Sequence, residues 1–413
     1  MENYVMAVDI GSTKIAAFLG RVADRQIVVE EHHAVPSQGV LRGEVANVED
    51  TVMSIKQCLG GLRGKLDARG LNVNVTEVVV GIAGRHIECR KETLSKFRQR
   101  HKSPVSAREL AEMKGDVKKI PLKAGAKILD VFERGITIDG EQQSQPVGCV
   151  GAMLAVSYLV VTGEIGAIKR IEDCVGRCEL NINKLMLEPV ASANAVLTRD
   201  ETKQGVALLD IGGGTSDLII YHDDRVCDLA VITCGGVLIT KDIMHTCGLT
   251  YAQAEQLKCD HGACLASEAS ERRRYAFASG AESTLSEKTL ATIIQKRVEQ
   301  IVDAVGYIIE QNGRDKVRSI VLTGGGSRLK HLPQLVSLHT GLDVRVGYPT
   351  VQVATESCDL APEYATAVGL MMNASNVPMK QNGRVPWYSS IKSSLEGVMG
   401  AFDSAFKEDN SRM

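Results

Sequence analysis

Four features that would define other classes of protein are missing from this sequence. The formal net charge is only −2 over 413 residues, whereas a protein that binds nucleic acid over its whole surface is strongly basic. None of the eleven cysteines forms a Cys-x-x-Cys pair, which favours reduced thiols in the cytosol. The longest apolar run, residues 147–161, is shorter than the roughly 20 residues of a membrane-spanning helix. The N-terminus lacks the basic and apolar leader of an exported protein. We therefore expect no nucleic-acid partner, no export and no transmembrane helix.

Two short stretches are nearly copies of each other, DIGSTK at residues 9–14 and DIGGGTSD at residues 210–217. Each lies between two short apolar runs, which predicts a strand, a glycine-rich turn and a second strand. The surrounding segments repeat one plan of three strands, a helix and a returning strand. Hydrophobic residues make up 44% of the chain and are enough to fill its cores. The repeated plan predicts an α/β chain with two duplicated halves.

Two predicted helices carry the clearest periodicity. One has apolar residues at steps of three and four over residues 48–66, with Asn47 as its N-cap and Gly70 as its stop. The other has an apolar stripe over residues 290–309 and ends before Gly313.

A basic segment interrupts the first half at residues 84–157. Between Arg85 and Lys127 there are thirteen Lys or Arg and five Asp or Glu residues. This surface could contact an acidic partner or lipid, or it could be the solvated face of a small inserted subdomain. Aromatic residues that would stack on a ligand are nearly absent there, with only Phe97 and Phe132, which favours the second interpretation.

The paired turns have the composition of phosphate-binding loops. Glycines let backbone N–H groups approach a phosphate closely, and Ser or Thr hydroxyls add donors. Two such loops on facing halves can clamp a polyphosphate, and their leading carboxylates, Asp9 and Asp210, could then hold one hydrated Mg²⁺. We therefore predict a nucleotide cleft between the halves, with Asp9 and Asp210 as metal ligands.

Three further features fit a nucleotide site. TGGGS at residues 323–327 predicts a strand, a glycine turn and a helix start that can accept an adenosine, although a plain strand-to-helix connection is the alternative. Lys14 is placed to meet the β- or γ-phosphate, or else it is solvated. Glu188 follows a strand and could orient an attacking water, or else it is a carboxylate favoured by a helix dipole.

With these residues assembled, the chain resembles the superfamily of actin, heat-shock-chaperone ATPases and sugar kinases. The two phosphate loops and the adenosine loop of that superfamily match DIGSTK, DIGGGTSD and TGGGS. Within it, the resemblance is to the FtsA family of bacterial cell-division proteins, whose sequence blocks occur in family order over nearly the whole chain. These blocks include GIAGRHIE, which opens the insertion, EPVASANAVL, AEQLK, VLTGGGSRLKHLPQL and EYATAVGLMM.

The resemblance implies a role for each matching residue. Phosphates would be held from one side by Gly11, Ser12, Thr13 and Lys14, and from the other by Gly212, Gly213, Gly214 and Thr215. Gly235 and Gly236 would line the cleft, Glu255 and Lys258 would contact ribose or adenine, and the adenosine loop would consist of Gly324, Gly325, Gly326 and Ser327. Glu188 would be the catalytic carboxylate that positions water, and Arg297 would receive the C-terminal tail of the tubulin-like protein FtsZ.

The resemblance also implies an actin-like ATPase fold in which each half carries an inserted subdomain. The first half would comprise residues 1–83, 158–204 and 361–373, with the basic insertion at 84–157; the second half would comprise 205–234 and 314–360, with a helical subdomain at 235–313 over the nucleotide. The implied function is that of an ATP- and Mg²⁺-binding protein, at most a weak ATPase. Such a protein would be cytoplasmic and would form filaments on the inner face of the cytoplasmic membrane at the division site, where it would tether FtsZ and meet other division proteins.

The end of the chain predicts a membrane contact independently. A linker at residues 374–386 precedes a helix at 387–407 with one apolar edge: Trp387, Ile391, Leu395, Val398, Met399, Phe402 and Phe406. This helix could lie in a membrane surface, or it could dock on its own domain or on a neighbouring subunit. Lys392 and Lys407 balance Glu396 and Asp403, so apolar burial must supply most of any membrane affinity.

Two other functions stay open on the sequence. A small-molecule kinase of the same superfamily would need a carboxylate base beside an acceptor pocket, and no such residue can be identified. A pilus-assembly ATPase would share the core and the insertion but normally lacks a terminal amphipathic helix.

Overall fold

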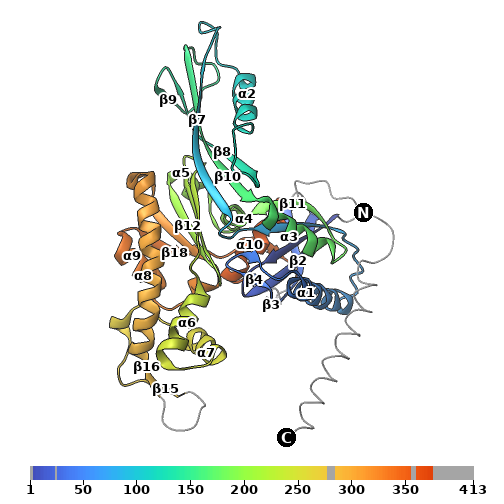
Figure 1. Cartoon of the computed structure of the whole chain (residues 1–413), viewed down its shortest axis with the longest axis vertical. Helices are drawn as coiled ribbons and strands as arrows, with labels where there is room; N and C mark the ends of the chain where they lie inside the picture. Colours follow the sequence, from blue (N-terminus) through green and yellow to red (C-terminus); the bar gives the residue numbers. More distant parts are fainter. Residues whose placement is uncertain (1–2, 24–25, 277–283, 355–359, 375–413) are drawn as a thin grey trace. The chain divides into compact units, whose positions relative to one another are not determined.

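The computed structural model describes residues 3–23, 26–276, 284–354 and 360–374 (Figure 1). The described residues form two compact units, one drawn from residues 3–82, 169–195 and 349–374 and the other from residues 83–168 and 196–348. Beyond Ala374, the predicted linker and the predicted helix at 387–407 lie outside the described residues. No helix in the described part of the chain has the length and hydrophobicity needed to cross a membrane.

The first unit is built on a mixed sheet with the strand order β11-β6-β1-β2-β3-β19. Its strands are β1 (Asn3–Ile10), β2 (Lys14–Ala23), β3 (Gln26–Pro36), β6 (Glu77–Ile82), β11 (Asn181–Leu187) and β19 (Gln352–Val353). The first three form an antiparallel meander, whereas β1, β6 and β11 run parallel to one another. The carboxyl ends of β1, β6 and β11 therefore lie at one edge of this sheet.

Helices cover both faces of this sheet. Side chains alternate between the two faces along each strand, so each face has side chains on which a helix can pack. On one face, α1 (Val48–Ala68) lies so close that Gly61 abuts the ring of His33. On the other face, α10 (Ala365–Ala374) places Met371 against Gly20. The caps predicted for α1 are confirmed, since Asn47 accepts hydrogen bonds from the first turn and Gly70 follows the helix with a φ of +70°. The other elements in this part of the chain are β4 (Val40–Leu41), β5 (Glu44–Val45), α3 (Ile165–Gly176), α4 (Glu188–Val196) and the 3₁₀ turn η4 (Pro362–Tyr364).

The second unit contains a sheet with the order β14-β13-β12-β17-β18. Its strands are β12 (Val206–Ile211), β13 (Ser216–His222), β14 (Arg225–Ile232), β17 (Ser319–Thr323) and β18 (Asp343–Val346). The meander from β12 to β14 repeats the meander from β1 to β3, so the predicted duplication is confirmed. Because β12 and β17 are parallel, Asp210 and Thr323 are neighbours at the carboxyl ends of the two strands.

Four helices of the second unit pack around a continuous apolar core that includes the stripe predicted on α8. They are α6 (Gly236–Cys247), α7 (Tyr251–His261), α8 (Glu287–Asn312) and α9 (Leu332–Thr340). The short helix α5 (Arg199–Gln204) has no buried residue. The other elements of this part of the chain are the 3₁₀ turns η1 (Ala266–Glu268), η2 (Arg314–Lys316) and η3 (Gly325–Arg328) and the hairpin of β15 (Arg274–Ala276) and β16 (Thr284–Ser286). The long helix α8 ends at Asn312, directly before Gly313, as the sequence predicted.

The basic insertion forms a separate sheet with the order β7-β10-β8-β9, with one helix beside it (Figure 1). Its elements are β7 (Ile87–Phe97), α2 (Ala107–Val117), β8 (Ala126–Ile138), β9 (Glu141–Gln143) and β10 (Met153–Glu164). Met113 and Val117 of α2 share a small core with Val156 and Tyr158 of β10.

Three predicted segment boundaries differ from the structure. The boundary after residue 157 falls inside β10, which pairs with β7 and β8 over its whole length. Residues 199–204 join the second unit, where Glu201 accepts hydrogen bonds from Arg345. The chain returns to the first unit before residue 361, because β19 pairs with β3. In each case a contact distant in sequence decides the location, and no local signal marks it.

A polar cluster around the buried Asn312 joins the insertion to the second half of the chain within the second unit. Asn312, 4% exposed, accepts hydrogen bonds from Lys91 (2.9 Å) and Arg134 (3.3 Å) of the insertion. Its amide donates to Asp228 of β14 (2.7 Å), which also pairs with Lys91 (2.8 Å). The basic side chains of the insertion therefore have a structural role at this joint.

Candidate functional site

The first predicted phosphate loop is the turn between β1 and β2. The Gly11 N–H donates to the Lys14 carbonyl oxygen (3.0 Å), and Asp9 lies just before this turn, buried near the end of β1. A side chain at Gly11 would lie 2.9 Å from the same carbonyl oxygen, so the turn requires glycine. Ser12 Oγ accepts a hydrogen bond from the Gly43 N–H (2.8 Å), which ties the loop to the hairpin of β4 and β5.

Lys14 has partners inside the first unit, contrary to the alternative that it is solvated. Its ammonium donates to the carbonyl oxygen of Glu363. It also lies 4.0 Å from the centroid of the Tyr364 ring. The positive charge is therefore held beside the first loop.

Glu188 lies at the same edge of the sheet as Asp9. It is the first residue of α4 and directly follows β11, and β11 runs parallel to β6 and β1. A side chain at Gly81 of β6 would lie 2.8 Å from Glu188 Cγ. The absence of a side chain at this position therefore makes room for the carboxylate.

The second predicted phosphate loop repeats the geometry of the first. The Gly212 N–H donates to the Thr215 carbonyl oxygen (2.9 Å), as Gly11 does to Lys14. The loop is held by the start of α6, because the N–H groups of Gly236 and Val237 donate to the carbonyl oxygens of Gly212 (2.9 Å) and Gly213 (2.8 Å). Carbonyl oxygens carry partial negative charge and would repel a bound anion. The hydrogen bonds from α6 engage two of these oxygens.

The predicted adenosine loop lies against Asp210. Gly324 has a φ of +78°, and a side chain there would collide with the Asp210 carboxylate and with the Ile211 carbonyl oxygen. Gly326 likewise abuts the Ile211 side chain. Ser327 Oγ closes the turn by donating to the Gly324 carbonyl oxygen (2.7 Å).

Glu255 and Lys258 fasten α7 to the start of α6. Lys258 Nζ donates to the Gly236 carbonyl oxygen (3.2 Å), to Thr240 Oγ1 (2.9 Å) and to Glu255 Oε2 (2.8 Å). Burial raises the pKa of Glu255, but the hydrogen bonds from Lys258 and Thr240 outweigh it and hold the pKa below its usual value. Glu255 therefore stays ionised next to Gly236.

The second unit thus brings together four of the predicted groups. They are the loop 212–215, the start of α6 at Gly235 and Gly236, the pair on α7, and the loop 324–327. This composition fits a nucleotide, because phosphate-binding loops need glycine backbone, and a Cβ at Gly235 or Gly324 would collide with neighbouring loop atoms. Asp9 and Lys14 belong to the other unit. Among the described residues, no group of three or more side chains forms a metal site, and Mg²⁺ needs only one or two carboxylates beside phosphate and water.

Arg297 is already engaged by an acidic residue. Its guanidinium forms a two-pronged salt bridge from α8 to Asp242 of α6, with distances of 2.6 and 2.9 Å, and it also donates to Gln300 (2.7 Å). The hydrogen bond to Asp242 raises the pKa of Arg297. An acidic peptide would have to share or displace Asp242.

Three neighbours of the site are not among the residues predicted from the sequence. They are Thr240, Gly43 and Tyr364, which lie in a helix, a hairpin and a 3₁₀ turn. Only the fold places them beside Lys258, Ser12 and Lys14. The spacing of Thr240 four residues after Gly236, which lets its hydroxyl donate to the Gly236 carbonyl oxygen (3.0 Å), is the one local cue.

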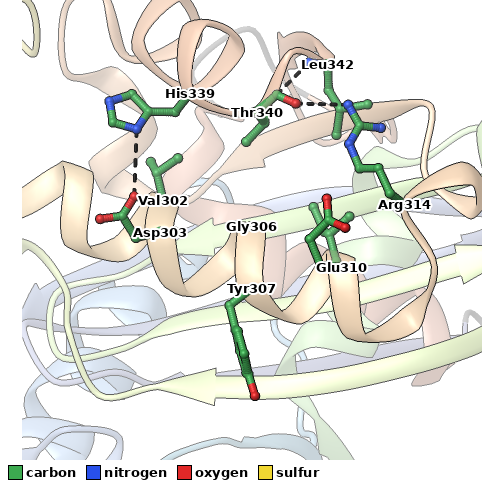
Figure 2. Close-up of a pocket in the computed structure, with 10 residues that line it drawn as sticks. Val302, Asp303, Gly306, Tyr307, Glu310, Arg314, His339, Thr340 and Leu342 are labelled. Carbon is green, nitrogen blue, oxygen red and sulfur yellow. Dashed lines mark hydrogen bonds and ion pairs between the residues drawn. The ribbon is translucent and has the colours of Figure 1, made fainter.

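A groove elsewhere in the second unit is separate from these loops. It has a volume of about 270 Å³ and lies between α8 and the segment from α9 to β18, with Asp303, Tyr307, Arg314 and His339 among its lining residues (Figure 2). His339 lies between Glu299 (3.6 Å) and Asp303 (3.8 Å). Its walls contain no residue of the predicted site.

Duplicated meanders with glycine turns at the carboxyl ends of their first strands, together with the inserted sheet, define the actin-like ATPase fold with an inserted SHS2 domain. The profile "SHS2 domain inserted in FTSA" matches residues 84–162. Among solved structures, the chain is similar to one described as the PilM–PilN type IV pilus biogenesis complex, with a TM-score of 0.66 and 18% identity, over 90% of this chain and 98% of that chain.

Sequence comparison identifies the family. The profile "Cell division protein FtsA" matches residues 207–369. The cell division protein FtsA of Neisseria meningitidis serogroup B is 30% identical over 397 residues, which cover 93% of this chain and 94% of the relative. That of Pseudomonas aeruginosa is 30% identical over 376 residues, covering 89% and 88%. The chain belongs to the FtsA family of actin-like cell division proteins.

Proposed function

We propose that this protein binds ATP with Mg²⁺ through its paired phosphate loops and acts as a filament-forming scaffold that tethers FtsZ to the membrane. The observation that carries the proposal is the match between the loops 9–14 and 210–217, which share one turn geometry and one position in two copies of the same meander. Two copies of a phosphate-binding turn suit a ligand with several phosphates.

Each predicted residue has a role in this proposal. Gly11 to Lys14 and Gly212 to Thr215 hold the phosphates, and Asp9 and Asp210 hold Mg²⁺ through water. Gly235 and Gly236 shape the site, Glu255 and Lys258 contact the nucleoside, and Gly324 to Ser327 cradle the adenosine. Glu188 orients water. Bound Mg²⁺ would neutralise phosphate charge, while the protein's own loops provide the positioning.

The scaffold role combines nucleotide binding with two attachments. In this proposal Arg297 and its surroundings on α8 receive the FtsZ tail, and the segment 387–407 contacts the inner face of the cytoplasmic membrane at the division site. A single helix with nearly zero net charge binds a membrane reversibly, whereas many on one filament bind together. Membrane attachment should therefore depend on polymerisation.

Electron microscopy of the purified full chain on lipid vesicles with Mg·ATP tests the proposal. We expect filaments on the vesicles for the intact chain and none for a chain ending at Val385. Replacing Phe402 and Phe406 with serine should also remove them, whereas replacing Ser393 and Ser394 with alanine should not. If the intact chain gives no filaments on lipid with ATP, the scaffold proposal fails.

A small-molecule kinase is the second candidate, because the superfamily resemblance includes sugar kinases. Incubation of the protein with Mg·ATP and a panel of sugars tests it directly. Robust sugar phosphorylation would replace the scaffold proposal, whereas slow ATP hydrolysis without it would be consistent with a nucleotide that acts by binding.

A further inference from the structure

One end of the insertion's sheet exposes a group of large apolar side chains. They lie at the end of β7, at the start of β10 and in the segment that leads into β10, and each is between 42% and 65% exposed: Phe97, Val147, Val150 and Met153. Phe97 and Met153 are cross-strand partners, so their side chains are neighbours on one face of the sheet. The next residue, Leu154, belongs to the core that the sheet shares with α2. Phe97 and Met153 therefore face away from that core, because side chains alternate along a strand.

Hydrogen bonds hold two loops together at this end of the sheet. The buried guanidinium of Arg98 donates to the carbonyl oxygens of Gly151 (2.8 Å) and Ser103 (3.0 Å). The N–H of Val105, whose side chain belongs to the core, donates to the Cys149 carbonyl oxygen (2.7 Å). The loop after β7 is therefore fixed beside the segment that carries the exposed valines.

The loop after β7 carries two exposed basic side chains, Arg100 and Lys102. Ion pairs engage many other basic residues of the insertion: Arg90, Lys91, Lys96, Arg98, Arg108, Lys119 and Lys123. Arg100 and Lys102, by contrast, form no ion pair with any residue that the structure describes. The exposed apolar group and these two charges form what we call the insertion tip: Phe97, Arg100, Lys102, Val147, Val150 and Met153.

We propose that the insertion tip is a membrane-contact site, at which the apolar side chains enter the headgroup region and Arg100 and Lys102 bind anionic lipid headgroups. An exposed apolar group of this kind marks an interaction surface, and basic side chains beside it favour a surface of negative charge. A lipid surface suits projecting side chains because it needs no complementary shape, whereas a protein partner has to supply pockets for them.

The charge of the tail gives this second contact a purpose. The segment 387–407 contains two basic and two acidic residues, so it gains little from anionic lipid. Stable attachment to a membrane takes two signals, for example one apolar anchor and one basic patch. The insertion tip supplies the basic patch. This inference goes beyond the proposed function, because it needs neither nucleotide nor filament.

Tryptophan fluorescence of the full chain without nucleotide tests the contact at the tip itself. The natural chain has one tryptophan, Trp387, so the double variant Trp387→Phe/Phe97→Trp reports on the tip alone, and Trp387→Phe gives the background. We expect its emission to shift to shorter wavelength on vesicles that contain phosphatidylglycerol and clearly less on vesicles of phosphatidylcholine. Lipids brominated in their acyl chains should quench it. The shift should shrink in about 1 M salt, where the Debye length falls to about 3 Å.

Vesicle sedimentation of charge variants tests the basic residues. Arg100→Gln/Lys102→Gln should weaken binding to phosphatidylglycerol vesicles by about 10- to 30-fold, since each basic residue near such a surface contributes about fivefold. Lys114→Gln/Lys118→Gln is the matched control. It makes the same change of charge on α2, which starts beside the tip and runs back along the sheet (Figure 1). Lys114 lies about 12 Å along the helix from its start, beyond the Debye length of about 10 Å, so binding should stay within about twofold of wild type.

Serine variants test the apolar side chains in the same assay. Phe97→Ser/Val150→Ser should weaken vesicle binding, whereas Leu338→Ser, an exposed leucine on α9, should not.

Three results would overturn the inference. One is an emission of the Phe97→Trp variant that does not change on anionic vesicles. Another is a shift that brominated lipid does not quench, which would assign the tip to a protein contact. The third is equal binding by the two glutamine double variants. None of these results depends on filaments or ATP, so they are distinguishable from a failure of the scaffold proposal.

Discussion

Replacing Gly235 with alanine tests whether the start of α6 shapes the nucleotide site. Gly235 has a φ of −156°, an extended conformation that any residue adopts. An added Cβ would lie 2.6 Å from the Gly212 carbonyl oxygen, 2.8 Å from that of Gly213 and 2.9 Å from that of Thr215. All three atoms belong to the backbone of the second phosphate loop, so no side-chain rotation relieves the contact.

The size of the effect follows from these distances. Unstrained heavy-atom contacts of a carbon lie at about 3.5 Å, so the loop and the helix must separate by between half an ångström and one ångström. A displacement of about 1 Å at a functional site can cost about 100-fold, and overpacking costs about 1–3 kcal/mol in the free energy of unfolding. We therefore expect Gly235→Ala to weaken ATP binding by about 10- to 100-fold.

Titration calorimetry with Mg·ATP and urea unfolding measure the two effects. Gly236→Ala is the milder matched variant, because a Cβ there meets Lys258 Nζ at 3.3 Å and the loop backbone only from 3.7 Å outward. It should weaken ATP binding clearly less than Gly235→Ala does. If Gly235→Ala binds ATP as tightly as Gly236→Ala, the loop 212–215 does not contact the nucleotide and the reasoning is refuted.

Three further predictions concern stability and can be checked by urea unfolding. Hydrogen bonds from Arg98 and from the backbone of Ser106 lower the pKa of Glu109 to about 2, from 4.5. The folded pKa lies below the unfolded value, so this contribution is present above pH 4.5 and is lost as the pH falls toward 2. Glu109→Gln should therefore cost about 1–2 kcal/mol at pH 7, allowing for solvent screening, and much less at pH 2; an equal cost at both values would contradict the assignment. Asn312→Ala should cost about 1–3 kcal/mol, because it removes the hydrogen bonds that the buried amide makes with Asp228 and Arg134, and a loss below about 0.5 kcal/mol would show that water replaces the amide. Gly306→Ala, within α8 and with open space around its Cβ, should stabilise the fold by about 0.5–1 kcal/mol, and a destabilised variant would show that this helix needs flexibility there.

The sequence predicts the parts of the fold that depend on neighbouring residues. The cap at Asn47, the stop at Gly70 and the end of α8 before Gly313 are local signals, and the structure has all three. The two glycine turns are likewise local, since each needs only a strand, a tight reversal and a second strand. Their tertiary neighbours are not: nothing near Lys14 in the sequence indicates that Glu363 and Tyr364 will hold it.

The insertion shows most clearly why the remaining boundaries could not be predicted. It interrupts the first half in sequence, and its long strand β10 is as apolar as a strand of the main sheet, which is why the sequence assigned residues 158–164 to that half. The structure pairs this strand with β7 and β8 instead. Lys91 and Arg134 of the insertion also contact Asn312 of α8, and Arg134 contacts the Cys227 carbonyl oxygen of β14. Lysine and arginine in a segment of net positive charge look like residues without a structural role, and only the partners Asp228 and Asn312, more than a hundred positions away, make two of them part of a joint. Composition therefore reports the average environment of a segment, whereas the unit it joins depends on a few specific partners.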